Sequence, residues 1–116
     1  MIDQNKLMNR IKLKTEKNHE TISSMMYFVG PCAVFAAKNL VSQQESLQMA
    51  WLDGETLQQK ELIAIQPGIA IQKVLKKEDK DAMLFILSDN VIVVVSTSDP
   101  IARPPQIINP SVSGRL

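Results

Sequence analysis

The feature that most constrains this chain is a pair of apolar runs in residues 82–97, AMLFILSDNVIVVVST, separated by the polar residues 88–90. Neither run carries a charge, and both are rich in the residue types that strands favour. The three residues between them tolerate turn conformations. The pattern therefore predicts a β-hairpin, and Asp89 with Asn90 as a two-residue loop would set its pairing.

Both faces of this hairpin are expected to be apolar. The facing pairs are Leu87–Ile92, Phe85–Val94 and Met83–Ser96 on one side, with Ile86–Val93 and Leu84–Val95 on the other. An antiparallel ribbon with one side in water would instead alternate apolar and polar residues. Each face therefore needs a cover, which a helix, a second sheet or another copy of the chain could supply.

Length and composition indicate one globular domain. A chain of 116 residues can bury about two thirds of the surface that its unfolded form exposes. Hydrophobic residues make up 45% and charged residues 22%, which is ordinary for a globular protein. The net charge of +1 favours neither nucleic acids nor acidic partners, so an electrostatic partner would need a local charged patch.

The cysteine content and the N-terminal residues predict a cytoplasmic protein. The single Cys32 excludes an internal disulfide, and the polar, charged N-terminus does not resemble a signal peptide. Residues 21–37 are uncharged, but the stretch is short for a membrane span and is interrupted by Gly30 and Pro31. We expect this stretch to be a buried core segment.

An amphipathic helix is predicted over residues 2–24. Its apolar residues recur at steps of three and four. Four basic residues form a ridge beside the apolar stripe: Lys6, Arg10, Lys14 and Lys17. This basic ridge either contacts an anionic partner or is a solvated helix face, and the solvated face is the favoured interpretation.

Residues 31–52 fit either helical or strand periodicity. A second helix is favoured for residues 31–44, and a strand is favoured from Leu47 onward. The Asp53-Gly54 pair is a strong two-residue hairpin signal, so residues 55–57 should open the partner strand.

Turn-forming residues in the second half of the chain predict more strands, followed by an extended arm. Residues 61–75 read as two strands joined by a type II turn at residues 66–69, where we expect a bulge, a corner or a change of direction. Residues 76–81 form a charged loop. Residues 98–116 hold four of the six prolines, so they predict an extended arm, whose apolar residues should pack on its own domain or on a neighbouring subunit.

The residue types needed for catalysis are scarce. The chain has one histidine, His19, and one cysteine, so neither a nucleophile with its base nor a zinc site is evident. The four glycines are isolated, which excludes a glycine-rich phosphate loop, and we expect no cofactor and no metal. Trp51 could line a ligand pocket, although a core position is favoured.

These observations predict an α+β domain over residues 1–97, with an arm over residues 98–116. One N-terminal helix, and a second helix over 31–44, would pack on an antiparallel sheet built from residues 47–97 and cover one face of the 82–97 hairpin. The favoured function is a non-enzymatic protein-interaction module acting as a homo-oligomer, such as a dimer. The candidate pocket or interface residues are Trp51, Phe85, Val94, Ile107 and Ile108.

Two other functions remain open. A small-molecule-binding protein would use an apolar pocket between helices and sheet near Trp51. A nucleic-acid-associated protein would use the basic ridge, a possibility that the near-neutral net charge disfavours.

Overall fold

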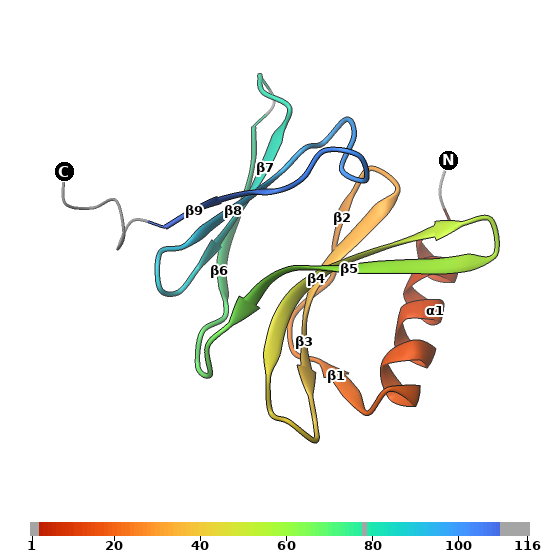
Figure 1. Ribbon diagram of the computed structural model, residues 1–116. Coiled ribbons are helices and arrows are strands. Elements are labelled where there is room, and N and C mark those ends of the chain that lie inside the picture. The colour runs from red at the N-terminus through yellow and green to blue at the C-terminus, as the bar shows by residue number, and fades with distance from the viewer. Residues whose placement is uncertain (1–2, 78, 110–116) are drawn as a thin grey trace. The chain divides into compact units, whose positions relative to one another are not determined.

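The computed structural model describes residues 3–77 and 79–109 (Figure 1). These residues contain one helix and nine strands, all of whose pairings are antiparallel, so the predicted α+β class is confirmed. The chain divides into two compact units, Met1–Gly68 (unit 1) and Ile69–Leu116 (unit 2). The domain limits expected at residue 97 remain a prediction. No helix within the described residues is long and apolar enough to cross a membrane.

Unit 1 is a helix on a five-stranded sheet. Its strand order is β1-β3-β4-β5, and β2 pairs with the same strand β3 as β1 does. The elements are α1 (Gln4–Lys17), β1 (Glu20–Ile22), β2 (Tyr27–Val29), β3 (Cys32–Asn39), β4 (Glu45–Asp53) and β5 (Thr56–Ile65).

Helix α1 is shorter than the predicted helix over residues 2–24. It begins after Asp3, whose side chain accepts a hydrogen bond from the Lys6 backbone N–H at 3.0 Å. It ends at Lys17, and His19 then adopts a left-handed backbone with φ of 58°. The following residues form strand β1. The prediction failed here because apolar residues continue at similar intervals across the helix end.

The core of unit 1 lies between α1 and one face of its sheet. Leu7 and Ile11 are buried on the helix and pack against Phe35 of β3 and Ala50 of β4. The opposite face of the sheet is also buried, since Val34 is fully inaccessible to solvent. Strand β3 is thus buried on both faces.

The predicted second helix over residues 31–44 is wrong, because residues 32–39 form strand β3. All six residues from Cys32 to Ala37 are buried, so the strand shows no polar alternation. A strand buried on both faces reads as a continuous apolar run, which periodicity alone does not separate from a buried helix.

The predicted hairpin after Leu47 is confirmed as β4 and β5. The pair Asp53–Thr56 closes a loop of Gly54 and Glu55, one residue later than the Asp-Gly signal implied. Gly54 has φ of 65°, which suits glycine at the first position of a type II′ turn.

Unit 2 is a separate four-stranded sheet with the order β6-β7-β8-β9. Its strands are β6 (Ile71–Lys77), β7 (Ala82–Leu87), β8 (Ile92–Val95) and β9 (Gln106–Ile108).

The turn at Pro67 and Gly68 separates strands of two sheets, and Gly68 has φ of 89°, as a type II turn requires. The single sheet predicted over residues 47–97 is therefore wrong. The sequence predicts a helix against residues 82–97, but helix α1 packs on the sheet of its own unit.

The 82–97 hairpin exists, but its predicted register is wrong by one residue. Phe85 pairs with Val93 instead of Val94. The loop contains three residues, because Asn90 adopts φ of 71° and its N–H donates to the Leu87 carbonyl at 2.9 Å. Three-residue loops with a left-handed last residue are a common alternative to the two-residue loop.

Both faces of this hairpin are apolar, as predicted, but their membership differs. The register places Phe85, Leu87, Val93 and Val95 on one face, where each is at most 2% exposed. Leu84, Ile86, Ile92 and Val94 share the other face and are only half-buried. We call these four residues, with Leu75 of β6 and Ile108 of β9, the half-exposed face.

Asp81 anchors the segment after β8. Its carboxylate accepts hydrogen bonds from the hydroxyls of Ser96 and Thr97, both at 2.7 Å, and from the Ser98 N–H and hydroxyl. Part of the predicted arm, Gln106–Ile108, then pairs with β8 of its own chain. Residues 110–116 of the arm lie outside the described residues.

Candidate functional site

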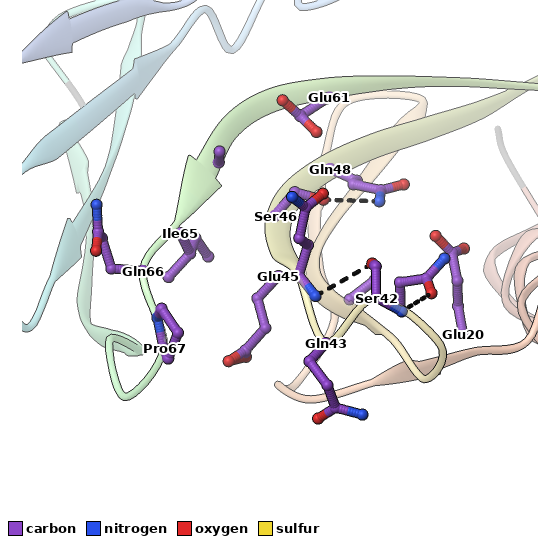
Figure 2. Close-up of a pocket in the computed structure, with 14 residues that line it drawn as sticks. Glu20, Ser42, Gln43, Glu45, Ser46, Gln48, Glu61, Ile65, Gln66 and Pro67 are labelled. Atoms are coloured by element: carbon purple, nitrogen blue, oxygen red, sulfur yellow. Dashed lines mark hydrogen bonds between the residues drawn. The ribbon is translucent and has the colours of Figure 1, made fainter.

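A polar groove of about 620 Å³ crosses one end of the unit 1 sheet (Figure 2). It extends from β1, across β3 and β4, to β5 and the turn that follows it. Its lining residues are Glu20, Ala37, Asn39, Ser42, Gln43, Gln44, Glu45, Ser46, Gln48, Glu61, Ala64, Ile65, Gln66 and Pro67.

A β-bulge shapes the floor of this groove. Gln48 pairs with Glu61, but the preceding Leu47 pairs with Ile63, so β5 has one extra residue at this point. Such a bulge bends the strand and increases its twist. Ser46 and Gln48 share the sheet face that α1 covers, because they pair with Ala37 and Phe35. This face is apolar beneath α1 and polar at this end.

Hydrogen bonds orient the polar groups on the floor. Gln48 donates from Nε2 to the Ser46 hydroxyl at 2.9 Å, and Gln59 donates to the amide oxygen of Gln48. Ser46 is 8% exposed. At the β3–β4 turn, the Asn39 side chain accepts bonds from the backbone N–H groups of Val41 and Ser42, each at 2.9 Å. The groove therefore has a defined shape and a fixed set of polar groups.

The charged groups of the groove are all acidic. Glu20, Glu45 and Glu61 contribute carboxylates, and none of the described residues that line the groove is Lys, Arg or His. A ligand with positive charge would fit these groups best. The carboxylates do not converge, since no cluster of His, Cys, Asp or Glu that could hold a metal occurs within residues 3–77 and 79–109.

The basic ridge is partly neutralised by the β4–β5 loop. Lys6 Nζ and Arg10 Nη2 lie 2.7 and 2.8 Å from the carboxylate of Glu55, and Arg10 Nη1 also donates to the Glu55 backbone carbonyl. These contacts hold the pKa of Glu55 below its ordinary value, the hydrogen bond from Lys6 contributing most. Lys14 and Lys17 lie in the last turn of α1 with exposed side chains.

The predicted pocket or interface residues lie on separate strands and faces. Trp51 is half-buried on β4, where it pairs with Cys32. Phe85 is fully buried, and the observed register puts Val94 on the opposite face of the unit 2 sheet. Ile107 and Ile108 are 43% and 45% exposed on the edge strand β9.

Sequence reasoning missed the groove because no local signal marks it. Its residues are single polar side chains at strand ends and turns, and they become neighbours only through the pairing of β3, β4 and β5. Neither His19 nor Cys32 lines it. Cys32 is fully buried, and this burial raises the pKa of its thiol to about 11.

Comparison of the chain with protein-family models, with curated proteins and with solved structures finds no match.

Proposed function

We propose that this protein is a non-enzymatic protein-interaction module that associates with a second copy of itself through the half-exposed face of unit 2. One observation supports the proposal: apolar residues follow one another across all four strands of this sheet face without full burial. In the pairing, Leu75 neighbours Leu84, Leu84 neighbours Val94, and Ile86 neighbours Ile92. Ile92 then neighbours Ile108 on β9.

A contiguous apolar sheet face of this kind is typical of an association surface. The same patch on a second copy would complement it, because a twofold interface brings identical surfaces together. Lys73 pairs with Ile86 and Lys77 pairs with Ala82, so both lysines lie on this face, and both are exposed. Charged residues around an apolar centre are the usual arrangement of protein interfaces.

A cytoplasmic location belongs to the same proposal, because a lone, unpaired cysteine is typical of reducing compartments.

Sedimentation equilibrium tests the proposal. The wild-type chain should sediment as a dimer or higher oligomer at micromolar concentration, and Ile86→Lys should sediment as a folded monomer, because the new charge lies on the associating face. The control is Asn9→Lys, which adds the same charge at an exposed position of α1 in unit 1 and should leave the oligomer intact. A wild-type monomer at 100 µM, chosen as roughly a hundredfold above a micromolar Kd, would refute the proposal.

A further inference from the structure

Strand β5 is an open edge of the unit 1 sheet. It pairs with β4 on one side, and it is the last strand in the sheet order. Within the described residues, none of the backbone groups of residues 57–61 bonds to a strand on the other side. An open edge of this kind presents N–H and C=O groups to which another extended chain can bond.

The register identifies which backbone groups face outward. The pair Asp53–Thr56 closes a two-residue loop and is hydrogen-bonded, so hydrogen-bonded and non-hydrogen-bonded pairs alternate from there. Leu57, Gln59 and Glu61 fall in the non-hydrogen-bonded pairs. Their own N–H and C=O groups therefore point to the open edge.

This edge lacks most of the features that keep strands from pairing. Strand β5 is ten residues long, contains no proline and carries one lysine, Lys60, and its bulge comes only after Glu61. By contrast, β6 in unit 2 carries Lys73, Lys76 and Lys77, and β9 has only three residues. Lysines and short length are the usual protections of an edge strand.

The polar groove reaches this edge at Glu61. The side chain of Glu61 shares its sheet face with Gln48, with which it pairs, and both residues line the groove. Figure 2 shows Glu61 on β5 above Gln48 and Ser46. An extra strand beside β5 would place alternate side chains on this same face, next to the Glu61 carboxylate.

We propose that the open edge of β5 binds an extended basic peptide as an added strand, whose alternate Lys or Arg side chains enter the acidic groove at Glu61. The backbone supplies most of the affinity in this mode, and the charges select the partner. The proposal concerns unit 1 and does not depend on self-association through unit 2.

Two synthetic peptides test the charge selection. Both are eight residues long with blocked ends, one alternating threonine with lysine and the other alternating threonine with glutamate. Titration calorimetry should give a Kd at least tenfold lower for the lysine peptide, and this affinity should fall as salt rises. In amide NMR spectra, the largest shifts should fall on residues 57–61. Equal affinities for the two peptides, or shifts centred on another strand, would overturn the proposal.

A pair of substitutions at Gln59 tests the strand addition. Gln59→Pro removes an outward N–H without removing a bond to β4, whereas Gln59→Ala retains that N–H. Both variants lose the side-chain bond to Gln48, so Gln59→Ala is a matched control. We expect Gln59→Pro to weaken binding of the lysine peptide at least tenfold, and Gln59→Ala to bind like the wild type. Equal binding by the two variants would contradict strand addition.

Two further variants cover the remaining outcomes. If Gln59→Pro does not fold, Glu61→Lys decides: it should abolish the preference for the lysine peptide, and an unchanged preference would overturn the proposal. The monomeric Ile86→Lys variant should still bind the peptide, which separates this site from the proposed association surface. If Gln59→Pro lowers the oligomeric mass and no peptide binds, a second copy occupies β5 and the peptide proposal is wrong.

Discussion

The carboxylate of Asp81, at the start of the 82–97 hairpin, lies 2.7 Å from the hydroxyl of Thr97 at its end. Asp81 also accepts bonds from Ser96 and Ser98, and Arg103 lies 3.2 Å from it. These donors lower the pKa of Asp81, with the Ser96 hydroxyl contributing most. One carboxylate thus fastens the segment that leads from β8 to β9.

Replacing Asp81 with Asn should lower the stability of the protein and change its pH dependence. A carboxyl group whose folded pKa lies below its unfolded value, about 3.9 for Asp, stabilises the fold above that value. The contribution is lost as the pH falls from about 5 towards the folded pKa. The urea midpoint of the wild type should therefore decline below pH 5, and Asp81→Asn should start lower and decline less.

The control for this prediction is Asp53→Asn, at an exposed position that ends β4. It should unfold at the wild-type midpoint and keep the wild-type decline in acid. Parallel curves for Asp81→Asn and the wild type would show that Asp81 does not stabilise the segment after β8.

Glu55→Gln should test whether the basic ridge can bind polyanions. The substitution removes the carboxylate that pairs with Lys6 and Arg10, so four cationic side chains of α1 become available together. Binding to a polyanion rises with the number of basic groups that it neutralises. We expect the variant to elute from a heparin column at higher salt than the wild type.

Glu61→Gln provides the matched charge control for the heparin experiment, because it changes the net charge equally at a residue of the groove. If the two variants elute at the same salt concentration, the basic ridge is a solvated helix face and the nucleic-acid alternative loses its support.

The sequence predicts the positions of most strands of this protein, but it does not predict how these strands are packed. Turn residues such as Gly54, Pro67 and Gly68 indicate the strand ends, because each suits the local backbone geometry of a turn, but the loop after β4 lies one residue later than Asp53-Gly54 predicts. The sequence predicts a helix over residues 31–44, where residues 32–39 form a strand, because burial on both faces removes the alternation that identifies a strand. Whether a strand is buried on one face or on both depends on tertiary packing, so the local sequence does not show it.

The register of the 82–97 hairpin shows how one backbone angle limits prediction. A left-handed Asn90 adds a third loop residue, and this single residue moves Val93 to the face of Phe85. The groove was beyond prediction for another reason: Glu20 of β1 and Glu61 of β5 line the same groove only because β3 and β4 pair between their strands.

Substitutions at Asn90 should measure the cost of that loop conformation. Asn90→Ala should destabilise the protein by about 1 kcal/mol, because alanine tolerates φ of 71° less well than asparagine does. Asn90→Gly should unfold at or slightly above the wild-type midpoint, since glycine adopts positive φ without strain. Chemical denaturation followed by circular dichroism gives both values. Equal stabilities for the two variants would mean that Asn90 does not determine the loop geometry.

The thiol of Cys32 should be unreactive in the folded protein. Cys32 is completely buried on β3, and burial raises its pKa to about 11, against a smaller opposing effect of Lys60. Thiolate is the reactive form, so the folded protein should react with a chromogenic disulfide reagent only through molecules that have transiently opened.

The rate of this reaction relative to the denatured protein distinguishes a buried thiol from an accessible one. In denaturant, one thiol per chain should react, and its rate should climb up to about pH 8.5, the ordinary pKa of cysteine. In buffer, the rate at each pH should be lower than in denaturant, because only the small fraction of molecules that are open can react. Leu7→Ala opens the core on the helix side of the sheet and should destabilise by roughly 2–5 kcal/mol, so it should accelerate the reaction through global opening. A native rate equal to the denatured rate at the same pH and reagent concentration would place Cys32 within reach of solvent and contradict its burial.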